Sequence, residues 1–426
     1  FVSLGGTNKK FKYYGFANFK FGDDWRPNSS FNLKNGYLHL TYSPNEKTNL
    51  NFEITKMNYL AQQPGGLTDQ AFTINPDTSF RKRNWFKVDW NLAAFQLDYE
   101  FNSSTRLNSR TFGLIASRES LGYLDQINRI DPGEDRNLIS GKFKNIGNET
   151  RLIHLYERNK LPWAFVVGIR VYRGNSENTQ GESNNLSGPD FYFSNNTSSI
   201  SSDNIESNYI FPSFNFSVFA EHIFNITEKL SITPGLRYEY IATSANGDYR
   251  TAYNDLAGNL IFDTVTNIKR VNNRDLLLTG IGFNFKLNEE IEIYANISQN
   301  YRSVNFTDMQ IRNPNFRIDP VLKDEQGYNS DLGIRGRLKD VLYFDASLFY
   351  LFYNNRIGNT IQIDSNLYNT YQYRTNISQS RTYGFESVVE CDWWKIFSDK
   401  KNYKWTTFLN IAYNNAMYIS SDISAF

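Results

Sequence analysis

The chain is poor in the residues that build disulfide scaffolds and metal sites. Its 426 residues include one cysteine and three histidines. A single cysteine excludes an intrachain disulfide framework, and the scattered His39, His154 and His222 offer no zinc-ligand spacing. The formal net charge is only +1, so the composition carries no signature of a nucleic-acid partner. We therefore expect no metal, no cofactor and no nucleic acid.

Long apolar runs are missing as well. No stretch of 18 apolar residues occurs, which excludes a transmembrane helix. A mean hydropathy of −0.55 argues against a helical membrane protein, but not against a barrel whose strands are only half apolar. No catalytic constellation stands out, so we do not expect an enzyme. No signal peptide is visible at Phe1, and we expect the chain to be an internal fragment of a longer protein.

What the chain has is the alternation of β-strands. In the second arm of residues 217–241, apolar side chains occupy every second position from Ile232 to Tyr240, and polar side chains fill the positions between them. Strand side chains alternate between two faces, so this arm has one apolar face and one polar face. The ribbon therefore needs an apolar partner on one side and water on the other.

Similar ribbons recur along the whole chain and predict about seven short turns and roughly fifteen strands. Further short turns lie near 44–47, 102–105, 159–161, 288–290 and 339–340. The short turns alternate with long polar connections at 61–80, 119–150, 174–210, 243–272 and 303–326. Outer-membrane barrels have this asymmetry, with short turns on one rim and long loops on the other.

Charged residues are confined to one face of the ribbons. A charge on a lipid-facing strand position costs about 2–4 kcal/mol at mid-bilayer, so this segregation fits a membrane wall. Aromatic residues are abundant, with 28 Tyr, 34 Phe and 7 Trp, and many lie near strand ends, where an interfacial girdle forms. We predict an all-β fold, an antiparallel transmembrane β-barrel. A soluble β-sandwich also segregates charge and stays the alternative on pattern alone.

One segment breaks the alternation. In "NWFKVDWNLAAFQLDYEF" the apolar set starts with Phe86, Val88 and Trp90 and continues with Phe95 and Leu97. The phase changes near the two alanines 93 and 94. A β-bulge is the simplest way to insert one residue into a strand, so we predict a bulge at this point.

Arginines collect at the rim that carries the long connections. Ten of them fall at or beyond the strand ends there: Arg81, Arg83, Arg118, Arg173, Arg250, Arg302, Arg312, Arg317, Arg356 and Arg374. Guanidinium groups bind carboxylates and phosphates in bidentate geometry, so a ring of them would attract an anionic solute. Our candidate ligand-binding residues are Arg81, Arg83, Arg118, Arg302, Arg312 and Arg317. The alternative is that each arginine pairs with a loop carboxylate or with lipopolysaccharide phosphate.

Several motifs resemble TonB-dependent outer-membrane receptors. After the strand end Tyr301-Arg302, the chain reads Asp319-Pro320, Leu322, Glu325, Asp331-Leu332-Gly333 and Arg335, and "RTYGFE" follows with Arg381, Gly384 and Glu386. The stretches "DDWRPNSSF" (23–31), "QQPGGLTDQAF" (62–72) and "RKRNWF" (81–86) resemble the ferric-citrate receptor branch of that family. The resemblance covers about residues 15 to 418.

The resemblance implies a receptor of the bacterial outer membrane. Such a receptor binds a ferric chelate, here iron-citrate or a similar siderophore, at the cell surface and passes it to the periplasm with energy from TonB. The family barrel has 22 strands around an N-terminal plug. The resemblance therefore implies that residues 1–426 are a partial barrel domain, with the plug, the TonB box and the last strands outside the chain. Its implied partners are the chelate, TonB, outer-membrane lipid and lipopolysaccharide.

Three alternatives stay open. The receptor could take another substrate, such as a different siderophore, haem or cobalamin, although no histidine between residues 223 and 426 offers an axial haem ligand. The chain could form a passive porin-like channel, a smaller barrel of about 16–18 strands. It could also be a soluble adhesin or sugar-binding β-sandwich.

Overall fold

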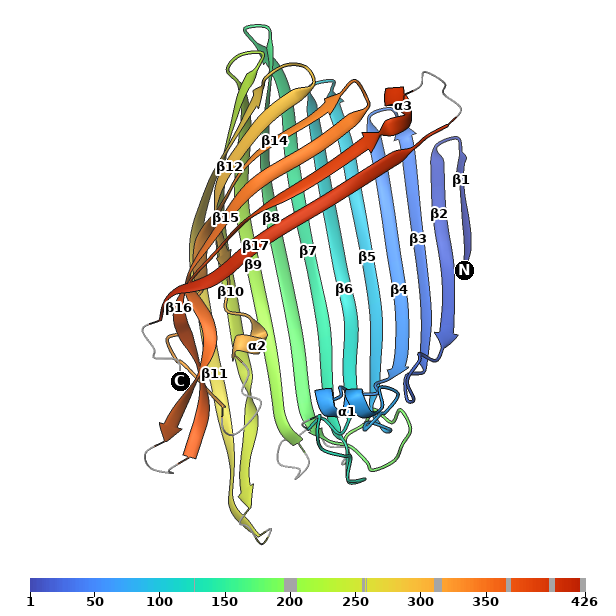
Figure 1. Cartoon of the computed structure of the whole chain (residues 1–426), viewed down its shortest axis with the longest axis vertical. Helices are drawn as coiled ribbons and strands as arrows, with labels where there is room; N and C mark the ends of the chain where they lie inside the picture. Colours follow the sequence, from blue (N-terminus) through green and yellow to red (C-terminus); the bar gives the residue numbers. More distant parts are fainter. Residues whose placement is uncertain are drawn as a thin grey trace.

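The computed structural model describes residues 1–125, 127–194, 205–254, 257, 259–309, 316–364, 369–397 and 403–421. They form one sheet of 17 strands that curls into an open barrel wall (Figure 1). All of its strand pairs are antiparallel except β13–β16, which confirms the predicted all-β antiparallel barrel fold. The number of described strands exceeds the predicted fifteen because the short strands at the start of the chain and at residues 316–318 had no clear pattern in the sequence.

The strands follow one another around the wall in chain order. They are β1 (Val2–Asn8), β2 (Phe11–Gly22), β3 (Phe31–Asn45), β4 (Thr48–Gln62), β5 (Trp85–Asn102), β6 (Thr105–Gly122), β7 (Asn137–Arg158), β8 (Leu161–Glu182), β9 (Ile205–Asn225), β10 (Leu230–Asn254), β11 (Leu260–Lys286), β12 (Ile291–Arg302), β13 (Phe316–Ile318), β14 (Glu325–Leu338), β15 (Leu342–Asp364), β16 (Asn369–Asp392) and β17 (Thr406–Ser421). Three short helices are α1 (Asp69–Ile74), α2 (Phe306–Met309) and α3 (Trp393–Phe397). No helix in the described part of the chain is long and apolar enough to span a bilayer.

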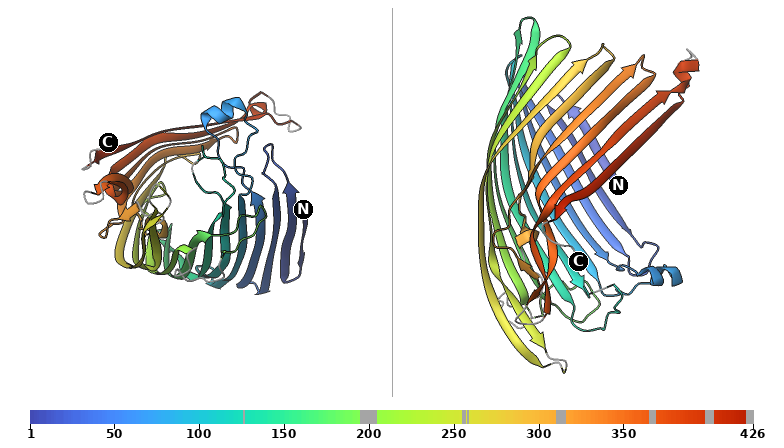
Figure 2. Two further views of the ribbon diagram at one scale, coloured as in Figure 1. Left: turned by 90° about the horizontal axis from the view of Figure 1, so that it is seen from below. Right: turned by 60° about the vertical axis from the view of Figure 1, so that its left-hand side comes forward.

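One strand departs from the chain order. β12 pairs with β14, and β13 lies between them in sequence but pairs in parallel with β16. Among the described pairings, β1 contacts only β2 and β17 contacts only β16, so these two strands are the edges of the sheet. Figure 2 shows the wall from below, curving around an interior with the two edges apart.

The two ends of the wall differ in the way the sequence predicts. Short turns at 46–47, 103–104, 159–160 and 287–290 gather at one end, the top of Figure 1, where α3 between β16 and β17 also lies. The β4–β5 connection with α1 and the β6–β7 and β8–β9 connections lie at the other end. We call these the short-turn end and the long-loop end. Three predicted connections were too long, because β7 begins within 119–150 and both β8 and β9 extend into 174–210. The largest difference is at 243–272, where β10 and β11 run on through most of the segment. Polar pairs such as Arg250–Asp263, 2.5 Å apart, continue the ladder there, and these carry no hydrophobic alternation.

The wall has an apolar face and a polar face. On β10, Leu236 lies on the same face as Tyr238, while Arg237 and Glu239 lie on the other and form an ion pair of 2.7 Å. The face with the exposed apolar side chains is called the lipid face here, and it includes Leu38, Leu40, Phe52, Ile54, Phe95, Val167, Ile169, Val171, Val218 and Leu236. The opposite, inner face carries ion pairs between strands, including Arg110–Glu53 and Arg170–Glu149.

The predicted bulge at Ala93–Ala94 is wrong. β5 pairs with β4 without a break from Trp85 to Tyr99, and its register with β6 shifts only beyond Glu100. Because the alternation continues, Phe95 lies on the lipid face and Trp90 lies on the inner face. The apolar residues therefore change sides of the wall and the backbone does not slip. From Ala93 to Phe101 the lipid-face set spans nine residues, close to the about 9–11 that a tilted strand needs to cross a bilayer.

A small buried core lies outside this band. Tyr209, Phe211, Ala245, Val304 and Met309 pack together, with Phe306 and Leu322 against them. It joins β9 and β10 to the connection between β12 and β14, whose described residues 303–309 and 316–324 we call the cross-brace.

Candidate ligand-binding site at the long-loop end

An aromatic surface lines the inner face where β4, β5 and β6 approach the long-loop end. Val88 lies opposite Tyr59 on β4 and opposite Arg118 on β6, and the rings of Tyr59 and Phe86 are 6.4 Å apart. Trp90 continues the same face of β5. We call Tyr59, Phe86, Val88, Trp90 and Arg118 the vestibule wall. Such a surface combines apolar contact area with one cation, as sites for small organic anions do.

Arg118 is the predicted site residue that the structure places best for a ligand. Its side chain is exposed on the inner face, opposite Val88. In the described part of the chain, no carboxylate oxygen lies within 4.0 Å of its guanidinium group. A bidentate donor with no anion beside it can accept a carboxylate from solution.

Arg81 and Arg83 have a different environment, because both side chains are buried. The guanidinium of Arg81 donates to the carbonyls of Arg129 at 2.7 Å and Asp125 at 3.1 Å, and it stacks on Tyr123. That of Arg83 binds both carboxylate oxygens of Asp131, at 2.5 and 2.9 Å. These contacts tie the β4–β5 connection to the β6–β7 connection. That either arginine also contacts a ligand stays a prediction.

A third arginine, which sequence reasoning missed, completes this arrangement. Arg136 is fully buried and donates to the carbonyls of Asn184 at 3.0 Å and Gly188 at 2.7 Å. It fastens the β6–β7 connection to the β8–β9 connection. We call Arg81, Arg83, Arg136 and Asp131 the loop clasp.

The loop clasp is expected to loosen in acid. Burial raises the pKa of Asp131, but hydrogen bonds from Arg83 and from the Gly133 N–H outweigh it and bring this pKa below its ordinary value of 3.8. A carboxylate whose pKa is lowered by folding stabilises the folded loops above pH 3.8 and loses that contribution as the pH falls through the lower folded value. Hydrogen exchange of residues 127–136 at pH 3 and pH 6 should therefore show faster opening at pH 3, beyond the intrinsic pH effect. An Asp131→Asn variant should lack most of this difference.

Arg302 belongs to an ion cluster at the base of the cross-brace. Its guanidinium is 2.8 Å from Asp308 and 3.1 Å from Glu325, and Glu325 also binds Arg356 at 2.6 Å. Glu325 is 1% exposed. Arg302 and Arg356 are therefore paired with carboxylates of the chain, Arg302 with Asp308 of the cross-brace and both with Glu325 at the start of β14.

The remaining arginines are spread over different surfaces. Arg317 on β13 is exposed and stands 4.0 Å above the ring of Tyr371, and Arg374 lies 3.6 Å from Asp308. Arg173 is exposed on the lipid face. Arg312 lies outside the described residues. The nine of these arginines that the structure describes therefore do not form one ring.

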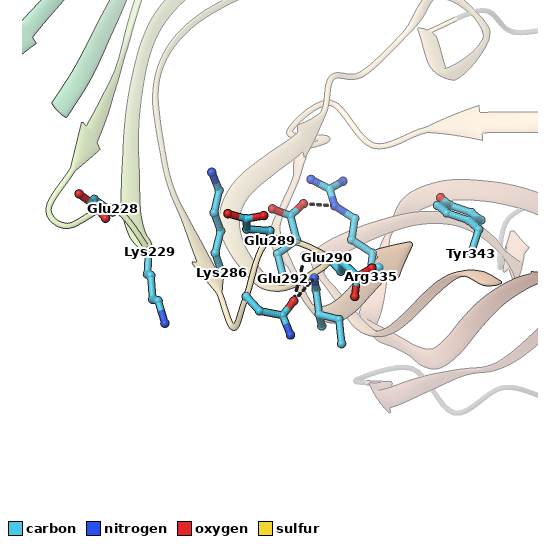
Figure 3. Close-up of a pocket in the computed structure, with 11 residues that line it drawn as sticks. Glu228, Lys229, Lys286, Glu289, Glu290, Glu292, Arg335 and Tyr343 are labelled. Atoms are coloured by element: carbon cyan, nitrogen blue, oxygen red, sulfur yellow. Dashed lines mark hydrogen bonds and ion pairs between the residues drawn. The ribbon is translucent and has the colours of Figure 1, made fainter. Parts of the chain in front are cut away.

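The short-turn end has a charged hollow of its own. Its volume is about 770 Å³, and Glu228, Lys286, Glu289, Glu290 and Arg335 are among its lining residues (Figure 3). Arg335 points to Glu292 and binds it, and the side chain of Asn288 accepts hydrogen bonds from the N–H groups of Glu290 and Ile291 at 2.8 Å. Because Arg335 is paired with Glu292 and the hollow lies at the short-turn end, the hollow is a weaker candidate than the vestibule wall.

These features define the class of the protein. A curled antiparallel sheet with a lipid face about one bilayer thick, an ion-paired inner face, short turns at one end and long loops at the other is the wall of an outer-membrane-type β-barrel. Residues 6–424 match the family model described as "TonB dependent receptor-like, beta-barrel". The chain therefore belongs to this family of outer-membrane barrels.

Solved structures with the same fold are longer. The chain superposes on the unliganded ferric citrate transporter FecA with a TM-score of 0.73 and 18% identity, covering 98% of this chain and 56% of that one. For the ferric-catecholate import receptor Fiu from E. coli K12 the TM-score is 0.70 at 13% identity, with 98% and 62% covered. For the ferric yersiniabactin uptake receptor FyuA from Yersinia pestis it is 0.69 at 12%, with 99% and 60% covered. A search of curated sequences finds no match.

Proposed function

We propose that this chain is the greater part of the barrel of a TonB-dependent receptor in a bacterial outer membrane. The receptor binds a ferric chelate, iron-citrate or a similar siderophore, at the long-loop end and passes it to the periplasm. It breaks and makes no covalent bond, so it is a transporter and not an enzyme. TonB and outer-membrane lipid are its proposed partners. The neighbours with ferric ligands in their names support the substrate class.

The vestibule wall is the observation that carries the proposal. It presents apolar rings and the exposed Arg118 to the interior at the long-loop end, where a solute from outside would enter. An iron-citrate complex offers carboxylates to the guanidinium and carbon–hydrogen surface to the rings. We also propose Arg317 as a second contact, because it is exposed beside Tyr371 on β13.

The substitution Arg118→Gln tests the site in the intact receptor. A charge-assisted hydrogen bond contributes about 1.5–3 kcal/mol, so the Kd for ferric citrate should rise about 10- to 100-fold. The control is Lys56→Gln, because Lys56 is exposed on the lipid face of β4, next to the vestibule wall in sequence. Calorimetric titration of both variants with ferric citrate measures the difference in Kd. Equal Kd values for Arg118→Gln and Lys56→Gln would show that Arg118 does not contact the ligand.

Uptake experiments separate a receptor from a porin-like channel. A strain that lacks the receptor should fail to grow on the chelate as its sole iron source, and a strain that lacks TonB should fail in the same way. Uptake that persists without TonB would favour the passive channel, and normal growth of the receptor deletion would contradict the proposed substrate.

A further inference from the structure

A cluster of cations lies on the lipid face of β7 and β8, just past the apolar band. On β8 the lipid-face residues Val167, Ile169 and Val171 are followed two positions later by Arg173. On β7, Ile146 is followed towards the long-loop end by Lys144 and then Lys142. Strand alternation places all of these on one face. The lipid face of β8 therefore changes from aliphatic to cationic at Arg173, and the cations of β7 begin directly past Ile146.

Register brings the three cations close together. Arg173 lies opposite Ile146, and Lys144 lies opposite Asn175, so Arg173 and Lys144 are diagonal neighbours, about 7–8 Å apart between Cα atoms. Lys142 is the next residue on the same face of β7. All three side chains are exposed. The cluster therefore spans the width of two strands.

The cluster has little internal compensation. Within the described residues, none of the three cations has a carboxylate oxygen within 4.0 Å, although Glu177 lies opposite Lys142 in the register. The lipid-face positions opposite Lys144 and Lys142 on β6 are Ile115 and Ser117, which carry no charge, and the next acid on that face, Glu119, pairs with Lys87 at 2.8 Å. Like charges on neighbouring strand positions repel, so an anion from outside the chain would stabilise this arrangement.

The position of the cluster selects the anion. Ile146 is 59% exposed and Ile115 is 63% exposed directly beside the cations, so an occupant meets apolar and cationic groups together. A lipid has both parts, because its phosphates stand where its acyl chains end. A second pair, Lys34 on β3 and Lys56 on β4, follows the apolar residues Leu38 and Ile54 in the same way.

We propose that Lys142, Lys144 and Arg173 form a binding site for the headgroup phosphates of a lipid in the leaflet at the long-loop end. Arg173 and Lys144 bind one phosphate, with the guanidinium in bidentate geometry, and Lys142 binds a second phosphate. The acyl chains lie against Ile146 and Ile115. The inference rests on the proposed function only for the membrane placement, and not for the chelate.

The triple variant Lys142→Gln, Lys144→Gln and Arg173→Gln tests the site in the intact receptor in detergent. Each cation near an anionic lipid surface contributes to the binding free energy. The loss of all three should therefore weaken binding of purified lipopolysaccharide about 100-fold. The readout is native mass spectrometry of lipid-bound receptor during lipid titration. A matched triple at the short-turn end, Lys160→Gln, Lys229→Gln and Lys286→Gln, changes the net charge equally and should bind like the wild type.

Two further arms identify the occupant. Enzymatically dephosphorylated lipopolysaccharide should bind the wild type as weakly as the intact lipid binds the triple variant. Inorganic phosphate at an equal phosphate concentration should not displace the lipid, and full displacement would assign the cluster to a free anion and overturn the proposal. Undiminished lipid binding by the triple variant would overturn it as well.

Chelate binding separates this proposal from the proposed function. The triple variant should bind ferric citrate like the wild type, which also shows that its barrel is folded. If the triple variant loses lipid binding while the wild-type receptor binds no ferric citrate, the result contradicts the proposed substrate and still supports the lipid site.

Discussion

Replacing Arg83 with methionine is expected to destabilise the loop clasp by about 3–5 kcal/mol, the range for breaking a buried ion pair. The side chains of Arg83 and Asp131 are 10% and 9% exposed, so Arg83→Met leaves a carboxylate without its partner in a nearly dry site. It also removes the donors to the carbonyls of Asn185 at 2.7 Å and Glu134 at 2.9 Å. Hydrogen exchange of residues 127–136 and 183–194 in the intact receptor measures the loss.

The same connection offers a matched control. Arg129 and Asp125 form an ion pair of 2.8 Å with side chains 61% and 36% exposed, and such surface pairs contribute little to stability. Arg129→Met should therefore leave the exchange rates nearly unchanged. If Arg83→Met lowers chelate affinity while the loops exchange as in the wild type, then Arg83 is a ligand contact, as the sequence predicted, and its structural role is minor.

Replacing Glu325 with alanine should release the cross-brace. Glu325 accepts hydrogen bonds from Arg302, Arg356 and the backbone N–H of Ile357, and its own side chain is 2% exposed. The side chains of Arg302 and Arg356 are 37% and 33% exposed, so water can solvate their charges in part when the carboxylate is removed. We therefore expect Glu325→Ala to destabilise the cross-brace by about 3 kcal/mol, the lower end of the range for breaking a buried ion pair.

Limited proteolysis reports on this change, because residues 303–309 and 316–324 should become cleavable in Glu325→Ala while the membrane strands stay intact. Asp340→Ala is the control, since its pair with Arg337 is 69% and 73% exposed and lies in a short turn. Wild-type resistance to protease in Glu325→Ala would show that the small apolar core, and not the ion cluster, holds the cross-brace.

The wall of the barrel could be predicted from the sequence because its signal is local. A two-residue period on β10 determines which face each side chain takes, and lipid on one side makes that period strict. The far ends of β10 and β11 could not be predicted, because Arg250 and Asp263 keep the strands paired where lipid no longer imposes a pattern. Hydrophobic alternation therefore marks the bilayer and not the full strand.

The candidate site was harder to predict because its determinants are far apart in sequence. Arg83 meets Asp131, 48 residues away, and the carbonyl of Asn185, 102 residues away, and no local pattern shows that these three belong together. The vestibule wall did leave a signal, the change of phase between Trp90 and Phe95. We interpreted it as a bulge, whereas it records the point where the apolar side chains turn from the membrane to the interior.

β11 and β12 separate at Gly280, and this separation has a consequence for ligand capture. Beyond it, β10 and β11 continue as one arm and β15 and β16 as another, and the cross-brace joins them through Arg270 to the carbonyl of Ile318 and through β13 to β16. The loop clasp ties three other connections into a second unit. Closing these segments over a solute would thus move two units whose parts are already bonded to one another. Such units lose little conformational entropy when they close.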